Sequence, residues 1–265
     1  MFSATSRKAL VESPKRTPNM SSISSIWRHP IKAHGREALA SVALKSGECM
    51  PWDRIWALAH EASKAPAGEW ARCVNFNRAA GIPTLMAITA ELDEDSQTIT
   101  LRHPDRPDLV FQPDDEPNAL VEWTTPLVPS GRAQPSHIMR LDKHGYPDSA
   151  YPSISLANSA SHAAVEQQLG RDLSIHRWRS NIWIDDVAPW VEFDWVGKDI
   201  SIGGAILRVK EPATRCMSTA ANPDTGQRDA DTLGALEHFG HQDFSVLAEV
   251  IQDGTIAIGD SVQVL

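Results

Sequence analysis

The stretch LMAITAELDEDSQTITLRH, residues 85–103, contains two short runs that are rich in apolar and β-branched residues. The polar segment DEDSQ (93–97) separates LMAITAEL (85–92) from QTITLRH (97–103). Two such runs joined by a few turn-forming residues predict a β-hairpin. The flanking sequence indicates how far this strand-rich structure extends.

Strand-like segments continue on both sides of the hairpin. Several short strands at close spacing favour sheets that close into a barrel or a sandwich. The segments are SSISSIW (21–27), RIWALAH (54–60), LVFQP (109–113), LVEWTTPLV (120–128), RWRSNIWID (177–185), WVEFDWVG (190–197), AILRVKEP (205–212), FSVLAEVI (244–251), TIAIG (255–259) and SVQVL (261–265).

Two other segments have the pattern of helices. Residues 158–170, NSASHAAVEQQLG, combine helix formers with a serine that can cap the start and Gly170 as a C-cap. Residues 229–240, DADTLGALEHFG, place apolar side chains at helical spacing. The predicted fold class is therefore mainly β with a few helices, an α+β arrangement.

The order of these segments predicts two structural units. A smaller β-rich unit is expected over residues 21–128 and a second one over residues 129–265. The polar, turn-rich tract 129–153 is the best candidate for a long loop or linker between them. Residues 1–20 are basic and rich in serine and proline, which predicts a disordered extension, with a weak transit-like segment or a true start at Met20 as the alternatives.

Composition excludes several classes of protein. The net charge of −9 argues against a nucleic-acid-binding surface. No apolar run approaches the ~20 residues that a membrane span needs, and the first residues do not predict a secretory signal. Three widely spaced cysteines, Cys49, Cys73 and Cys216, form no disulfide framework, zinc ribbon or iron–sulfur motif. A reducing, cytoplasmic compartment is the expected location.

One cysteine lies in an unusual setting. Cys216 occurs in EPATRCMSTAANPDTG (211–226), a turn-rich stretch, directly after Arg215. A neighbouring guanidinium stabilises a thiolate, and a thiolate is a ligand for soft or redox-active metals. The alternative is a small side chain buried in a barrel.

Basic residues form a second group of candidates. Alternate residues of a strand share one face, so a strand over 177–185 would present Arg177, Arg179 and Asn181 together. This face could hold a phosphorylated or multi-acceptor ligand, or it could simply be solvated. Lys32 in HPIKAHGRE (29–37) and Arg54 in WDRIW (52–56) are further cations that could equally decorate the surface.

Other polar residues give weaker signals. His238 and His241 have a spacing that can suggest a metal site, but a cationic helix end explains them as well. Asp185, Asp186 and Glu192 are conceivable proton donors, although their spacing does not specify an acid–base pair. No glycine-rich dinucleotide motif, phosphate-binding loop or nucleophile elbow is present.

Five segments in order resemble the MOSC family, named after the C-terminal part of molybdenum cofactor sulfurase. The resemblance covers nearly the whole chain after residue 20 and is strongest to the branch with an N-terminal β-barrel domain, which includes the mitochondrial amidoxime-reducing component. The segments are the W-x-H-P-I-K pattern at 27–32, DRIW (53–56), RWRSNIWID (177–185), TRCMSTAANPDTG (214–226) and DGTIAIGDSVQVL (253–265).

The resemblance implies a MOSC-type barrel that binds the molybdenum cofactor, a phosphate-bearing pyranopterin that holds molybdenum. It implies that Cys216 is the protein ligand of the metal and the catalytic residue. The implied cofactor-binding residues are Arg179 and Asn181 for the pterin, Thr214 and Arg215 beside the cofactor, Lys32 and Arg54 at the phosphate, and Ser161 at a helix start. Ala33, Ala213, Ser180 and Asn222 depart from the family pattern and leave the substrate class open.

The function implied by the resemblance is an oxidoreductase that reduces N-hydroxylated or other N-oxygenated small molecules. The chain has no cluster, flavin or nicotinamide motif of its own, so the electrons would come from a separate reductase, ferredoxin or cytochrome-type protein. Two alternatives remain open at this point. The chain could carry the cofactor without turnover, or Cys216 could relay sulfur as a persulfide.

Overall fold

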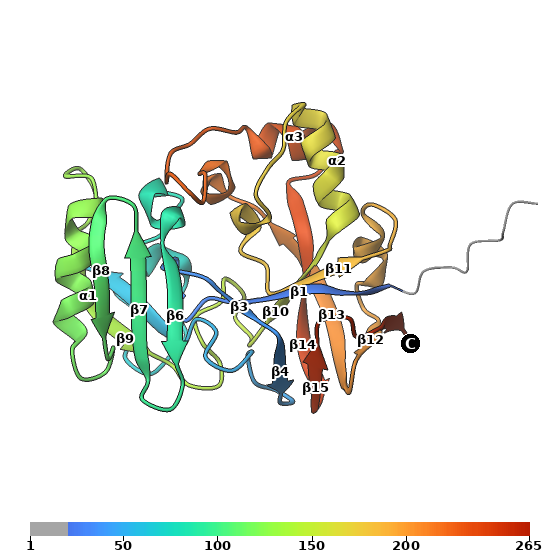
Figure 1. The fold of residues 1–265 in the computed structure, drawn as a ribbon, viewed down its shortest axis with the longest axis horizontal. Helices are drawn as coiled ribbons and strands as arrows, with labels where there is room; N and C mark the ends of the chain where they lie inside the picture. The colour runs from blue at the N-terminus through green and yellow to red at the C-terminus, as the bar shows by residue number, and fades with distance from the viewer. Residues whose placement is uncertain (1–20) are drawn as a thin grey trace, which may run out of the picture.

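A computed structural model describes residues 21–265, so the extension predicted for residues 1–20 lies outside the described residues. The chain forms two lobes that lie side by side (Figure 1). The first lobe contains β2, β5 to β9 and α1, and the second contains an eight-stranded sheet with α2 and α3. No helix among residues 21–265 is long and apolar enough to cross a membrane.

The second lobe is built on a sheet that closes on itself. All neighbouring strands are antiparallel except β10 and β11, which are parallel and connected through α2 (Ser159–Leu169). A bridge between Ser22 and Ser261 joins the two sides of the sheet and completes a barrel. The strand order is β16 (Val262–Val264), β12 (Asp199–Ile202), β13 (Ala205–Thr214), β14 (Asp243–Gln252), β10 (Ile154–Asn158), β11 (Ile182–Asp185), β1 (Ser22–Arg28) and β3 (Glu37–Leu39).

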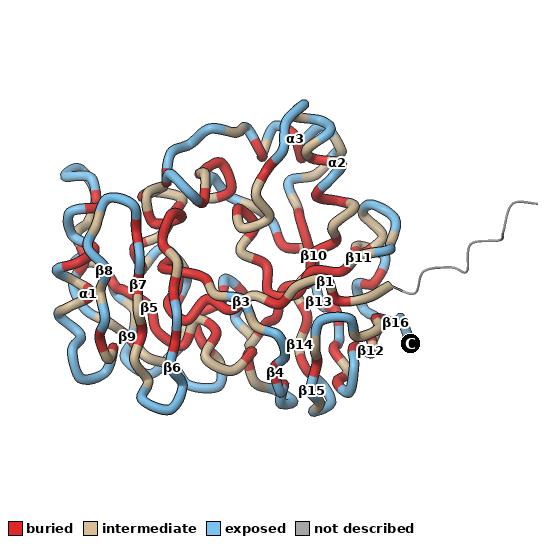
Figure 2. Tube along the Cα trace, in the orientation of Figure 1, coloured by how far each residue is buried: buried red, intermediate tan, exposed pale blue. Residues whose placement is uncertain are grey.

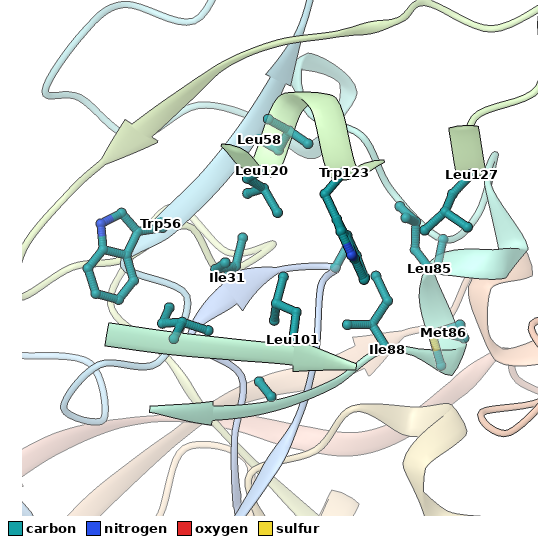
Figure 3. Packing of buried hydrophobic residues seen from close by; sticks show 14 of the residues in the cluster. Ile31, Trp56, Leu58, Leu85, Met86, Ile88, Leu101, Leu120, Trp123 and Leu127 are labelled. Carbon is teal, nitrogen blue, oxygen red and sulfur yellow. The ribbon is translucent and has the colours of Figure 1, made fainter. Parts of the chain in front are cut away.

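The first lobe contains the predicted hairpin, although the strand predicted over 85–92 begins only at Thr89, because a 3₁₀ helix, η2 (Pro83–Ala87), occupies its start. β6 (Thr89–Asp93) pairs antiparallel with β7 (Thr98–His103), and β8 (Arg106–Phe111) continues that sheet. A second small sheet contains β2 (Ile31–Lys32), β5 (Trp56–His60) and β9 (Pro135–Arg140). Figure 3 shows large apolar side chains, including Leu101, Leu120 and Trp123, packed between these sheets and α1 (Pro117–Thr124). The prediction of a mainly β fold with few helices is confirmed.

Strands from both ends of the chain share the same sheets. β1 lies at the N-terminal end yet pairs with β11, and β4 (Ser41–Leu44) pairs with β15 (Gly254–Ala257). In the opposite sense, β9 follows residue 129 and pairs with β5 of the first lobe. Buried segments of β1 run through the middle of the molecule in Figure 2. Strand pairing therefore crosses the boundary between residues 128 and 129, and the division of the chain into two domains there stays a prediction.

Several predictions of local structure were wrong. Residues 120–128 form the end of α1 and a 3₁₀ turn, because Leu120, Trp123 and Thr124 are buried at helical spacing after a proline in the first turn. Residues 190–197 contain a 3₁₀ helix, η5 (Val191–Trp195), instead of a strand. The tract 129–153 is not all loop, since it contains β9.

Both predicted helices are present. α2 ends at Gly170, whose φ of +65° is the left-handed conformation expected of a C-cap. Its N-cap is Asn158, which accepts a hydrogen bond from the Ala160 N–H at 2.8 Å, so the serine cap was wrong. α3 (Thr232–His238) is capped by Asp231. Both helices lie on the same side of the barrel in Figure 1.

Candidate cofactor site

A cavity of about 350 Å³ is lined by residues of both lobes. Volumes in this range are typical of small-molecule sites. All of the predicted site residues except Ser161 line it. They are Lys32 and Arg54 from the first lobe and Arg179, Asn181, Thr214, Arg215 and Cys216 from the second.

Cys216 is exposed at the edge of this cavity. It follows the end of β13, and its Sγ lies 3.2 Å from the Ser218 hydroxyl. The next residues form η6 (Met217–Ala220), and buried Arg177 forms a hydrogen bond with its last residue. Arg177 donates to the Ala220 carbonyl at 3.1 Å and to Asp229 at 2.5 Å. The thiol is therefore accessible while the backbone beside it is held in place.

The turn after Cys216 is pressed against the first lobe. Buried Arg36 donates to the carbonyl oxygens of Met86 at 3.0 Å and Pro223 at 3.2 Å, which ties the 222–226 turn to the first lobe. Ala221 is fully buried in the first lobe's apolar core. The position of the cysteine loop consequently depends on how the two lobes meet.

Two cations of the first lobe are held by oxygen acceptors. Lys32 donates to the Tyr146 carbonyl at 2.8 Å and to Asp148 at 2.6 Å. Arg54 forms an ion pair with buried Asp53 and donates to the Arg179 carbonyl at 2.7 Å. The Arg54 contact joins the two lobes beside the cavity.

The guanidinium of Arg179 differs from these two cations in its hydrogen bonding. Its Nη2 is buried and has no hydrogen-bond partner among residues 21–265. Burial, together with the charges of Arg54 and Arg36, lowers the pKa of Arg179 to about 9. An anion in the cavity would supply the missing acceptor and countercharge.

Arg215 is held by backbone and aromatic contacts. It donates to the Phe244 carbonyl at 2.8 Å and to the Trp178 carbonyl at 2.9 Å, and its guanidinium lies over both aromatic rings. Burial lowers the pKa of Arg215 to about 10. No carboxylate forms an ion pair with Arg215 in the described part of the chain, so this charge also favours an anionic ligand.

The polar groups of Asn181 and Thr214 have internal partners. The Asn181 carbonyl oxygen accepts from the Ser155 hydroxyl at 3.0 Å, and its amide donates to the Trp27 carbonyl at 3.1 Å. The Thr214 hydroxyl donates to Asp243 at 2.6 Å. These two residues shape the wall of the cavity.

The predicted single strand over 177–185 was wrong. A 3₁₀ helix, η4 (Ile175–Trp178), occupies its start, and Arg179 has a φ of +49° before β11 begins at Ile182. The left-handed residue turns the chain, so Arg177 and Arg179 do not share a strand face. Arg177 forms hydrogen bonds with η6, whereas the Nη2 of Arg179 has no hydrogen-bond partner among residues 21–265.

Ser161 is separate from the cavity lining. Its hydroxyl is fully buried, donates to Glu192 at 2.7 Å and accepts from the Trp190 N–H at 2.8 Å. Glu192 also binds the Asn158 amide, so the start of α2 already holds a carboxylate of the chain itself. The geometry does not support a cofactor contact for Ser161, because neither Ser161 nor Glu192 lines the cavity. Burial raises the pKa of Glu192 above its ordinary value.

Several residues of the cavity carry no motif in the sequence. Cys73, Arg78 and Asp148 all line it. Arg78 donates to the Cys73 sulfur at 3.2 Å. Only the pairing of lobes reveals these residues, because nothing in their local sequence distinguishes them.

The geometry also bears on metal binding. Among residues 21–265, no group of three or more His, Cys, Asp and Glu side chains could hold a metal ion. His241 packs against the rings of Trp190 and Phe193. The histidine pair therefore does not form a metal site of this kind in the described chain.

Comparison with known families identifies both parts of the chain. The MOSC domain matches residues 141–263, and the MOSC N-terminal beta barrel domain matches residues 20–131. The chain belongs to the MOSC domain family. The cavity of this MOSC protein thus takes residues from both matched regions.

Individual relatives match parts of this MOSC protein. Mitochondrial amidoxime-reducing component 1 of Danio rerio is 29% identical over 113 residues, 42% of this chain and 34% of that protein. A molybdenum cofactor sulfurase of Drosophila grimshawi is 35% identical over 81 residues, 31% of this chain and 10% of that protein. The YUAD protein of Bacillus subtilis has a TM-score of 0.47 at 10% identity, over 92% of this chain and 96% of that one.

Proposed function

We propose that this MOSC protein binds the molybdenum cofactor in the cavity and reduces N-hydroxylated or other N-oxygenated compounds. The main support is one combination of groups in a single cavity, the exposed Cys216 thiol and the Arg179 guanidinium, whose buried Nη2 has no hydrogen-bond partner among residues 21–265. A thiolate is a soft metal ligand, and a guanidinium binds phosphate with two parallel hydrogen bonds. A phosphate-bearing metal cofactor uses both.

The residues present fit this cofactor. Lys32, Arg54, Arg179 and Arg215 would hold its phosphate and pterin, and Cys216 would be the metal ligand. The buried Nη2 of Arg179 is the specific sign of a missing partner, since buried polar groups are otherwise hydrogen-bonded. The name of the amidoxime-reducing relative supports the choice of N-oxygenated substrates.

The reaction would convert an N–OH group to N–H, consuming two electrons and two protons and releasing water. When bound, the cofactor would supply the electron chemistry, because the chain has no redox motif of its own. The side chains would bind and orient the reactants. A separate electron-donor protein, a reductase, ferredoxin or cytochrome, would deliver the electrons, and a cytoplasmic location stays a prediction.

Molybdenum content tests this proposal. The protein is produced in a host that makes the cofactor, and metal is measured by elemental mass spectrometry for wild type, Cys216→Ala and Cys49→Ala. Cys49 is a control because it is a buried thiol in the first lobe's core. Near-stoichiometric metal in wild type and Cys49→Ala, lost in Cys216→Ala, supports the site. Absence of metal from wild type contradicts it.

One observation favours a second candidate. The exposed Cys216 thiol could accept sulfur as a persulfide, in line with the name of the sulfurase relatives. Such a relay, or a cofactor carrier, would show no turnover of N-hydroxylated substrates even when loaded and supplied with electrons. Intact-protein mass spectrometry separates the two, because only a relay gains one sulfur atom on Cys216.

A further inference from the structure

Arg78 presents a cation to the cavity from the first lobe. Its Nη1 donates to the Cys73 sulfur at 3.2 Å, and a neutral thiol is a weak acceptor. Within residues 21–265, no carboxylate or carbonyl oxygen accepts a hydrogen bond from this guanidinium. Most of its N–H groups are therefore available to a ligand.

The backbone that carries Arg78 is rigid. The preceding residues Phe76 and Asn77 are both buried. Asn77 donates from its backbone to Leu58 at 2.9 Å, and the Arg78 carbonyl accepts from the Gly81 N–H at 3.0 Å. A side chain on a fixed backbone is suited to select ligands, because the backbone loses little conformational entropy when a ligand binds.

Arg78 is separate from the main group of cations. Arg54 lowers the pKa of both Arg179 and Arg215, which shows that these three charges lie within electrostatic reach of one another. Arg54 also donates to the Arg179 carbonyl at 2.7 Å, whereas the Arg78 side chain, within residues 21–265, donates only to the Cys73 sulfur. Arg78 therefore approaches the cavity outside this hydrogen-bonded group of cations.

We propose that Arg78 determines substrate specificity by binding a carboxylate on the substrate. The favoured substrates are N-oxygenated compounds that carry this carboxylate away from the reacting nitrogen. The fork of a guanidinium matches the two oxygens of a carboxylate, which gives orientation as well as affinity. This inference rests on the proposed function, since it concerns the substrate of the same cavity.

Two matched probe pairs test the role of Arg78. Turnover is compared for benzamidoxime and 4-carboxybenzamidoxime, and calorimetric binding is compared for benzamidine and 4-carboxybenzamidine. The variants are Arg78→Gln and Arg72→Gln, each in the cofactor-loaded protein. Arg72 is the control because it loses the same charge six positions earlier, is exposed and does not line the cavity.

We expect wild type and Arg72→Gln to prefer the carboxylated member of each pair. Arg78→Gln should reduce that preference roughly tenfold, the usual effect of losing a charge-assisted hydrogen bond. An unchanged preference in Arg78→Gln would overturn the inference. Loss of molybdenum from Arg78→Gln would overturn it too, by placing Arg78 in the cofactor site. If wild type reduces neither probe, the proposed function fails, and the binding pair alone decides the role of Arg78.

Discussion

Substitution of Gly226 tests how the cysteine loop depends on the contact between lobes. Gly226 has a φ of +67°, and a Cβ placed on it would lie 2.5 Å from the Thr84 Cα and 3.0 Å from the Thr84 carbonyl oxygen. Both neighbours are backbone atoms of the first lobe, so no side-chain rotation relieves the clash. Gly226→Ala must therefore push the 222–226 turn away from the first lobe.

Gly170 supplies a matched control for backbone conformation. Its φ is +65°, and a Cβ there would meet nothing within 4 Å. Gly170→Ala should lower the free energy of unfolding by about 1 kcal/mol, because alanine is strained in the left-handed conformation. Gly226→Ala adds an overpacking cost of about 1–3 kcal/mol, so we expect a loss of roughly 2–4 kcal/mol in total.

Urea unfolding followed by tryptophan fluorescence measures both free energies of unfolding. Metal content measured on the same samples should fall in Gly226→Ala, because Cys216 and the displaced turn belong to one loop. Adding Thr84→Ala should not rescue Gly226→Ala, since the clash is with backbone. Equal destabilisation of the two glycine variants would refute the close approach of the lobes at this turn.

Two further predictions concern charge. Arg179→Gln should reduce molybdenum content at least tenfold, roughly the loss of one charge-assisted contact, while exposed Arg208→Gln retains the metal. Buried His34 has its pKa lowered by burial to about 4. Because its folded pKa lies below the unfolded value of about 6.5, His34 contributes stability above pH ~6.5 that is lost as pH falls toward 4. Urea unfolding at pH 7 and 5 should show less pH dependence in His34→Asn.

Local pattern was sufficient to predict much of the fold. The hairpin over 85–103 and the two helices have periodicity and end signals that operate within a few residues. The strand prediction for 120–128 was wrong because Val121 and the threonines raise β-propensity, while burial of Leu120 and Trp123 against the sheets selects a helix. Tertiary packing overrides propensity in such short segments.

Site residues that belong to a sequence motif could be predicted, and site residues that only the folded chain brings to the cavity could not. Cys216, Arg215 and Arg179 belong to sequence segments that resemble a family, and they do line one cavity. Arg78 has no such mark, because its importance arises only when the two lobes meet. Ser161 was assigned from the family resemblance, and the sequence could not reveal that its hydroxyl donates to Glu192.

The arrangement of charges links ligand binding to the contact between lobes. Arg54 belongs to the first lobe and Arg179 to the second, and burial, followed by repulsion from Arg54, lowers the pKa of Arg179. Buried Asp53 forms an ion pair with Arg54, which also donates a hydrogen bond to the Arg179 carbonyl. An anion bound between the two guanidiniums would convert this repulsion into a bridge. Any ligand that binds the folded state alone raises its stability by mass action, so a phosphate-bearing ligand should strengthen the lobe contact that positions Cys216.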